Sequence, residues 1–213
     1  MPRPLRPAEV QAFRERLCDA AERLFAERGF AAMTLRELAA ALGVSPMTPY
    51  RYFRNKEEIF ETVRSACFRR FGIGIEQAVV GEPCPIRRIQ RVGRAYVRFA
   101  EREPHAYRIM FHLEAGPTAM PEDPTQDEEL GRGWLVLHRA VEEGVAQGFL
   151  RGDAPTLAHL AWVLMHGLVT LHLSGHLRLG RSLDDLLEPA LENFLFGSAA
   201  RPIPLPKQIG GSS

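Results

Sequence analysis

The residues from 34 to 56, TLRELAAALGVSPMTPYRYFRNK, constrain the fold of this chain more than any other stretch, because start and stop signals for helices follow one another closely there. Thr34 is followed three residues later by Glu37, which is the capping-box pattern that begins a helix. Gly43 then ends this helix, and Val44 supplies the apolar residue that accompanies a left-handed glycine stop. The stretch therefore predicts short helices joined by a tight turn, with the length of a helix-turn-helix motif.

Two different starts are open for the helix that follows the turn. Ser45 is a good N-cap with Pro46 in the first helical position, but Pro49 then removes the first hydrogen bond inside the helix. Alternatively, residues 45–48 form a tight turn, and Thr48 caps a helix that begins at Pro49. Both alternatives predict a short third helix with a 3₁₀-like or distorted first turn.

The rest of the chain shows apolar residues at the three- and four-residue spacing of helices and no alternation typical of strands. Asn55, with Glu58 three residues later, begins the longest of the remaining segments. Outside the motif, the predicted helices span about residues 8–28, 56–79, 86–102, 105–112, 126–147, 155–175 and 182–196. We therefore predict an all-α fold of about nine helices without internal repeats.

The composition narrows the class of protein. The chain has 213 residues, of which 46% are hydrophobic and 25% charged, enough for one large domain or two smaller ones. No uninterrupted apolar run approaches the roughly 18 to 20 residues of a membrane helix, and the N-terminus lacks the apolar segment of a signal peptide. The three cysteines have neither metal-site nor disulfide-framework spacing. A cytoplasmic protein without membrane contact is the simplest interpretation.

The net charge of +1 conceals a basic surplus in the helix-turn-helix stretch. Its basic residues, which outnumber the single acid Glu37, are Arg36, Arg51, Arg54 and Lys56. Hydroxyl groups, helix starts and lysines bind phosphate oxygens, and an arginine such as Arg51 can contact a guanine edge through two hydrogen bonds. These residue types indicate a surface that binds nucleic acid.

The three aromatic residues of this stretch can instead be core residues. We expect Phe53 to lie in the core. For Tyr50 and Tyr52 we favour contact with DNA, because one short helix cannot bury three rings on a single face.

Two segments resemble a known family. A long first helix followed by TLRELAAALGVSPMTPYRYFRNKEEIF resembles the DNA-binding domain of TetR-family transcriptional regulators over roughly residues 10–62, most specifically in its YxYFxxKEE ending. The segments AYVRFAEREPHAYRIMF and WVLMHG, the latter at residues 162–167, resemble the WHG type of TetR C-terminal domain. The resemblance implies a dimeric DNA-binding protein with a ligand-binding C-terminal half.

The resemblance also implies roles for individual residues. Phosphate contacts are implied for Thr34, for Tyr50 or Tyr52, and for Lys56, and groove contacts for the third helix. The sequence departs from the family pattern at Met47, often a glycine, and at Pro49, usually an aliphatic residue. Together with the local charge, this predicts a DNA-binding set of Thr34, Arg36, Ser45, Met47, Thr48, Tyr50, Arg51, Tyr52 and Lys56.

The second half offers candidates for a ligand site. His166 lies in an apolar helical stripe with Trp162, and a buried histidine needs a partner. The predicted ligand-binding residues are Tyr107, Phe111, His112, Trp134, Trp162 and His166, and the alternative is a packed core without a cavity. His172 and His176 have the spacing of a helical metal pair, but no complementary ligand lies nearby, so we expect neither a metal nor a cofactor.

A stripe of arginines follows one face of the helix at residues 86–102. Its members recur with helical spacing and are Arg87, Arg91, Arg94 and Arg98. The stripe fits either an anion or acyl-CoA site or a solvated face paired with acids such as Glu101 and Glu103. We favour the solvated face.

The last two predicted helices are apolar over more than one face, which favours a four-helix seam with a second copy of the chain. The predicted interface residues are Leu157, Leu160, Leu164, Leu168, Leu183, Leu187, Leu191 and Phe194.

These observations predict a homodimeric regulator, preferably a repressor that a small molecule releases from a pseudo-palindromic DNA operator. The alternatives are an activator or a metal-responsive regulator of the same fold, or a small-molecule binding protein or enzyme that does not bind DNA. No catalytic motif supports an enzyme. The predicted regions are a flexible arm (1–8), the helix-turn-helix domain (9–55), a helical regulatory and dimerisation domain (56–197, with a connecting helix at 56–79) and a disordered tail (198–213).

Overall fold

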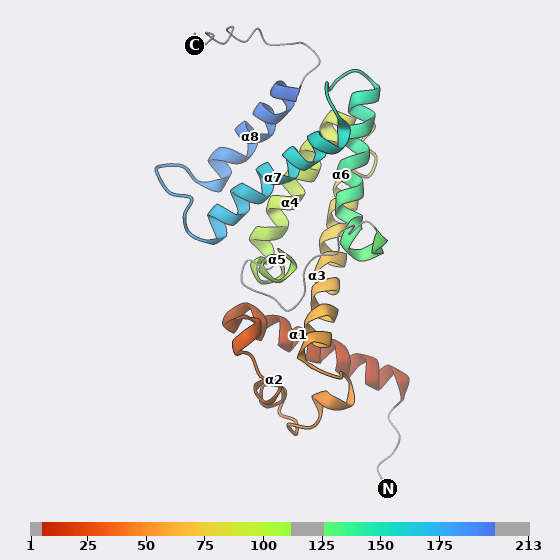
Figure 1. Ribbon diagram of the computed structural model, residues 1–213, viewed down its shortest axis with the longest axis vertical. Coiled ribbons are helices and arrows are strands. Elements are labelled where there is room, and N and C mark those ends of the chain that lie inside the picture. The colour runs from red at the N-terminus through yellow and green to blue at the C-terminus, as the bar shows by residue number, and fades with distance from the viewer. Residues whose placement is uncertain (1–5, 112–125, 199–213) are drawn as a thin grey trace, which may run out of the picture. The chain divides into compact units, whose positions relative to one another are not determined.

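A computed structural model describes residues 6–111 and 126–198 of the chain (Figure 1). All regular elements within these residues are helices, which confirms the all-α prediction. In chain order they are α1 (Pro7–Ala32), α2 (Leu35–Ala41), the 3₁₀ helix η1 (Pro49–Arg51), α3 (Lys56–Val79), α4 (Pro85–Arg102), α5 (Pro104–Phe111), α6 (Glu128–Ala146), α7 (Ala154–Leu173) and α8 (Leu183–Ser198).

The helices form two compact units, and the predicted domain boundary at residues 55–56 stays a prediction. The first unit contains the chain up to residue 81 together with residues 94–136, and the second contains residues 82–93 and the chain from residue 137 onward. The first unit extends beyond the helix-turn-helix because α1 packs against α3 and both helices pack against α5. The helix-turn-helix stretch therefore shares its hydrophobic core with helices that come later in the sequence.

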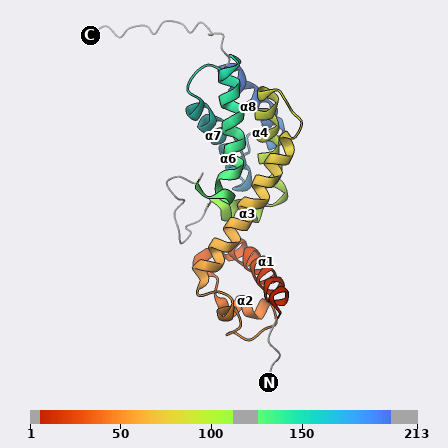
Figure 2. The same ribbon diagram turned by 90° about the vertical axis from the view of Figure 1, so that its right-hand side faces the viewer.

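In the first unit, α1 lies across the N-terminal part of α3 (Figure 2). Gly29, which follows the predicted helix at residues 8–28, has a φ of 75° and interrupts α1 before a last turn that ends at Ala32. Phe25, Phe30 and Phe60 pack around this interruption, with ring centroids 5.1 to 5.8 Å apart. This aromatic cluster fixes the end of α1 on α3.

In the second unit, α7 and α8 form an antiparallel pair that lies side by side (Figure 1). One face of α7 is buried within the chain, and its residues recur every three or four positions: Leu157, Ala158, Ala161, Met165 and Val169. From α8, Leu183 and Leu191 are buried in the same unit. The opposite face of α7 is apolar too, but exposed.

Among the described helices, α7 is by length and composition apolar enough to cross a membrane, with a mean hydropathy of 1.4 over an 18-residue window. Threonines and histidines interrupt this helix, so the high average does not contradict the expectation that no uninterrupted apolar run comes near that length. Length and composition are weak evidence for a membrane helix, since a helix that packs against another protein chain has the same composition. Only 28% of that window is buried in the protomer.

Candidate nucleic-acid interface

The α2 helix begins and ends as its sequence predicts. The Thr34 hydroxyl accepts a hydrogen bond from the Glu37 N–H at 3.3 Å, and the Glu37 carboxylate accepts one from the Thr34 N–H at 2.9 Å. This backbone hydrogen bond holds the pKa of Glu37 below its usual range. At the other end, Gly43 adopts a φ of 66°, which a residue with a Cβ rarely adopts. Val44 then donates its N–H back to Ala39 at 3.0 Å and closes the helix.

The third helix of the motif is only the three-residue 3₁₀ helix η1. Residues 45–48 form a turn in which the Thr48 N–H donates to the Ser45 carbonyl at 2.8 Å. Pro49 has no N–H, so no α-helical bond reaches back from it to Ser45, and the helix starts at Pro49 itself. The prediction of a short, 3₁₀-like helix is confirmed, with the start at Pro49. The ring of Pro49 is buried, in the place of the usual aliphatic residue.

Arg14 of α1 holds the end of η1. Its Nη1 donates to the Tyr52 carbonyl at 2.6 Å, and its guanidinium lies 4.2 Å from the centroid of the Phe53 ring. Phe53 is buried, as predicted. The Tyr52 ring packs on Phe13 with centroids 4.6 Å apart, so part of this residue serves to attach η1 to α1. No local pattern indicates the role of Arg14, because its partner is a backbone carbonyl 38 residues away.

Lys56 is attached to the end of α1 and does not extend into solvent. Its Nζ donates to the carbonyls of Phe30 at 2.7 Å and Met33 at 3.0 Å, and lies 3.4 Å from that of Ala31. The same ammonium group lies 4.3 Å from the centroid of the Phe30 ring. The phosphate contact predicted for Lys56 stays a prediction, and the geometry gives the residue a structural role as well.

The remaining predicted DNA-binding residues are largely solvent-accessible. Those that are exposed are Thr34, Arg36, Ser45, Met47, Tyr50 and Arg51, and Thr48 is partly buried. Met47 and Tyr50 are the notable cases, since large apolar side chains rarely stay exposed, and these are 67% and 52% exposed. They flank the start of η1, beside Arg51. The structure thus collects hydroxyl, aromatic, apolar and basic groups over the turn and η1.

Two nearby arginines form surface ion pairs with acids of the same chain. Arg28 pairs with Glu37, and Arg54 pairs with Glu58 at 3.1 Å. Among the described basic residues from 34 to 56, Arg36 and Arg51 are exposed and have no acidic partner within the motif. They are the charges best placed to meet phosphate or base edges.

The predicted ligand-binding residues fall into both compact units. Tyr107, Phe111 and Trp134 belong to the first unit and Trp162 and His166 to the second, while His112 lies outside the described residues. Tyr107 is fully buried, and its hydroxyl lies 3.0 Å from that of Tyr96, a residue that the prediction missed.

The residues around Tyr107 form an aromatic cluster on α3, α4 and α5. Ring centroids within 6.2 Å of one another connect Phe68, Phe71, Tyr96, Phe99, Tyr107 and Phe111. These six rings come from three helices, which is why helical spacing alone did not group them.

His166 lies partly buried on α7, with its ring 5.8 Å from that of Trp162. Burial lowers the pKa of the His166 imidazole below its usual range, which favours the neutral form. His176, one member of the candidate metal pair, places Nδ1 2.9 Å from the Ser174 hydroxyl. Among the described residues, no three histidine, cysteine, aspartate or glutamate side chains gather as metal ligands do.

The predicted interface residues divide between two faces. Leu157, Leu183 and Leu191 are buried within the described chain, and the interface role predicted for them stays a prediction. The others stay accessible in whole or in part, and they are Leu160, Leu164, Leu168, Leu187 and Phe194. Val163, Leu171 and Phe196, which the prediction does not include, are also exposed. Helical spacing shows which leucines share a face, but only the structure shows which face is buried.

The arginine stripe is partly accounted for by a buried acid. The Glu82 carboxylate accepts hydrogen bonds from Arg87 Nε at 2.9 Å and from the Cys84 N–H at 3.0 Å, and pairs with Arg91 at 2.9 Å. The Cys84 N–H is the main cause of a lowered pKa of Glu82. The paired interpretation of the stripe is therefore confirmed for these two arginines, although the acid is Glu82 and not Glu101 or Glu103.

Comparison with known proteins matches two family models to the chain. Residues 17–63 match the model described as bacterial regulatory proteins, tetR family. Residues 89–194 match the model described as tetracyclin repressor-like, C-terminal domain. The first match covers the helix-turn-helix, and together the two cover most of the described residues.

Two transcriptional regulators are similar in sequence to this chain over most of its length. The HTH-type transcriptional repressor KstR2 of Mycolicibacterium smegmatis is 27% identical over 152 residues, 69% of this chain and 72% of its own. The HTH-type transcriptional activator FasR of the same species is 29% identical over 158 residues, 74% of this chain and 68% of its own. A solved structure of a protein of unknown function from Rhodococcus sp. RHA1 superposes with a TM-score of 0.75 at 27% identity, covering 93% of this chain and all of the other.

Proposed function

Because the chain belongs to the TetR family of DNA-binding transcriptional regulators, we propose that it acts as a homodimer that binds a pseudo-palindromic operator and leaves it when a small molecule binds. Its relatives and both family models are regulators and not enzymes. The observation that carries the proposal is the exposed surface over the turn and η1, which Arg14 and Lys56 hold against α1. A cytoplasmic location, where the DNA is, belongs to the same proposal.

DNA contact is proposed for the exposed groups of the motif. Arg36 and Arg51 supply charge to phosphates. Arg51, which lies in η1, is also proposed to contact a base edge. Tyr50 and the hydroxyls of Thr34 and Ser45 supply hydrogen bonds that orient the motif. Because a two-fold dimer presents two such surfaces, the half-sites are expected about one helical turn, roughly 34 to 36 Å, apart or a multiple of it.

The proposed dimer uses the outer face of α7. Leu160 and Val163 are 52% and 60% exposed, and Leu171 continues the same face further along the helix. A row of exposed aliphatic side chains on one helix face is costly in water and is stabilised by packing against the same face of a second copy.

Effector control is proposed for the second half of the chain. The partly buried imidazole of His166 lies beside the Trp162 ring, and small-molecule sites commonly combine a polar group with aromatic side chains in this way. A ligand shifts the dimer only through a different affinity for its DNA-bound and free states, typically about 1 to 3 kcal/mol. His166→Ala is expected to change ligand release and to leave ligand-free DNA affinity intact. An equal loss of both indicates a structural histidine.

The sign of regulation is proposed as repression. KstR2 is a repressor and FasR an activator, so the relatives include both signs. A reporter driven by the bound promoter decides between them, since deletion of the gene raises transcription for a repressor and lowers it for an activator.

A gel shift tests the proposal directly. Purified protein is mixed with DNA that flanks its own coding region and with DNA selected from random sequences. Wild-type protein is expected to bind, Arg51→Ala to bind at least tenfold more weakly, and Arg139→Ala, which removes an exposed arginine of α6, to bind like wild type. Failure of the wild type to bind either DNA pool favours the small-molecule binding protein instead. Native mass spectrometry of the purified protein identifies a co-purified effector or metal.

A further inference from the structure

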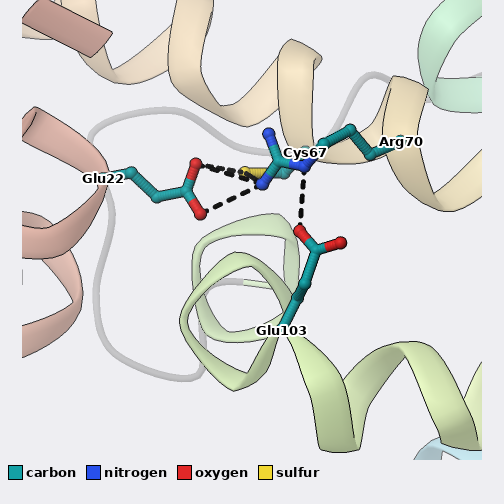
Figure 3. A network of polar contacts seen from close by, with 4 residues as sticks. All are labelled: Glu22, Cys67, Arg70 and Glu103. Carbon is teal, nitrogen blue, oxygen red and sulfur yellow. Dashed lines mark hydrogen bonds and ion pairs between the residues drawn. The ribbon is translucent and has the colours of Figure 1, made fainter. Parts of the chain in front are cut away.

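Arg70 of α3 joins two carboxylates that come from different parts of the chain (Figure 3). Its Nε donates to Glu103 at 2.8 Å, and its Nη2 donates to both oxygens of Glu22, at 3.0 and 3.1 Å. Glu22 belongs to α1, and Glu103 lies at the junction of α4 and α5. One guanidinium thus connects three helical elements of the first unit.

The charges at this junction do not balance locally. Two carboxylates face one guanidinium, and the fourth member, Cys67, donates its thiol to Glu22 with sulfur and oxygen 3.7 Å apart. Burial raises the pKa of the Cys67 thiol far above its usual range, so it stays neutral and adds no charge. The junction therefore carries one net negative charge, and Arg70 is what keeps the two acids from repelling each other.

Arginine is required by the geometry. The guanidinium presents a separate edge to each acid, with Nε toward one and Nη2 toward the other, and its fork is rigid. The ammonium of a lysine is a single point charge without these two separated edges. A lysine at position 70 is expected to pair with one acid and to release the other.

Each acid is tied to a functional element. Glu103 sits at the start of α5, where its carbonyl accepts the first hydrogen bond of that helix, from the Tyr107 N–H at 3.0 Å. Glu22 lies on the same helix as Arg14, which holds the carbonyl of Tyr52 at the end of η1. Through α1, the junction is thus connected to the DNA-reading surface.

We propose that Arg70 is a positioning residue that couples the placement of α5 to that of α1, and through α1 to the turn and η1. A displacement of α5 that withdraws Glu103 removes one of the two acids that orient the guanidinium, so Arg70 then holds Glu22 and α1 less firmly. The coupling between α5 and α1 rests on the hydrogen bonds of Arg70 with Glu103 and Glu22. Its use in effector control rests on the proposed function.

Hydrogen exchange of the full-length protein, without DNA or effector, tests the coupling. Arg70→Met leaves two uncompensated carboxylates, so exchange of the α1 amides around Glu22 is expected to rise by about tenfold. Glu103→Gln alone is expected to raise it less. Glu101→Gln, the same change two residues earlier at an exposed position of α4, is the control and is expected to leave α1 exchange unchanged.

The double variant gives the decisive result. In the Arg70→Met background, Glu103→Gln removes the repulsion with Glu22, so it is expected to slow α1 exchange again, whereas in the wild type it speeds exchange. This change of sign is specific to a shared cation. Effects of equal sign and additive size in both backgrounds overturn the coupling.

Two further measurements keep the outcomes separate. If Arg70→Met fails to fold, Arg70→Lys replaces it, and the same reversal at smaller amplitude is expected. Without a reversal there, the coupling is overturned.

DNA affinity of the same variants is measured by gel shift. A reversal in exchange without any change in DNA affinity supports the coupling and removes its proposed link to operator binding.

Discussion

At the scale of single residues, Lys56 shows how one position carries two possible roles. The family resemblance implies a phosphate contact. In the structure its ammonium group instead donates to the carbonyls of Phe30 and Met33 at the end of α1, where helix carbonyls lack partners of their own. A cation at a helix C-terminus also interacts favourably with the helix dipole. Both roles have consequences that can be measured separately.

Lys56→Ala is expected to lower the free energy of unfolding by about 1 to 3 kcal/mol, because partly buried carbonyls lose a charged donor. Denaturant or thermal unfolding measures this. If Lys56 also contacts phosphate, the slope of log affinity against log salt falls by about one unit. Lower stability with an unchanged slope assigns Lys56 to the fold alone, and unchanged stability contradicts the anchoring role.

Met47 is expected to determine sequence preference and not stability. Its side chain, in the turn before η1, is 67% exposed. In the major groove, the apolar group that it would contact is the methyl group of thymine. Met47→Ala is expected to change unfolding by less than about 0.5 kcal/mol while relaxing the preference for thymine at one position. Competition between DNA with thymine and DNA with uracil measures this, and an equal preference in wild type and variant contradicts the assignment.

At the scale of elements, the close approach of α3 and α6 gives two glycines of α3 opposite roles. A Cβ on Gly72 would lie 2.7 to 2.9 Å from the side chain of Arg132, including its Cβ, whereas a Cβ on Gly74 would meet nothing within 4 Å. Arg132 is held in place by ion pairs with Glu76 and Glu128. Gly72 is therefore required by packing, and Gly74 only weakens the helix.

Gly72→Ala is expected to destabilise the protein and Gly74→Ala to stabilise it. Alanine gains about 1 kcal/mol over glycine in a helix interior. At Gly72 this gain is outweighed by an overpacking cost of about 1 to 3 kcal/mol, because Arg132 must move at its Cβ and not only at its tip. Thermal unfolding of both variants measures the difference. A stabilised Gly72→Ala protein would show that α3 and α6 separate easily.

At the scale of the whole molecule, α7 is a helix with two apolar faces of which the protomer covers one. Polar residues are too few to make the outer face a solvated surface, and Leu160, Val163 and Leu171 stay exposed on it. The free energy available from covering them, at about 25 cal/mol per Å² of buried apolar surface, favours a second copy.

Val163→Glu is expected to convert the dimer to a monomer, because it places a charge in the proposed interface. Light scattering after size-exclusion chromatography measures the mass, and affinity for a two-half-site DNA is expected to fall with it. Val80→Glu replaces another exposed valine, at the end of α3, and is expected to leave the mass unchanged. A monomeric wild type, or a dimeric Val163→Glu protein, contradicts the proposed interface.

The sequence alone determined the helical elements and the kind of protein. The capping residues, as well as Gly43 and Pro49, act on their immediate neighbours. Local hydrogen bonding therefore sets the limits of α2, the turn that follows it and the short length of η1. Only the tertiary structure decided which side chains of these helices are buried or bonded to distant parts of the chain. Arg14, Arg70 and Lys56 find partners 23 to 48 residues away, and which leucines of α7 and α8 stay exposed depends on what covers the other face. Local signals reach one helical turn, whereas charge pairing and burial depend on segments that the chain brings together only when it folds.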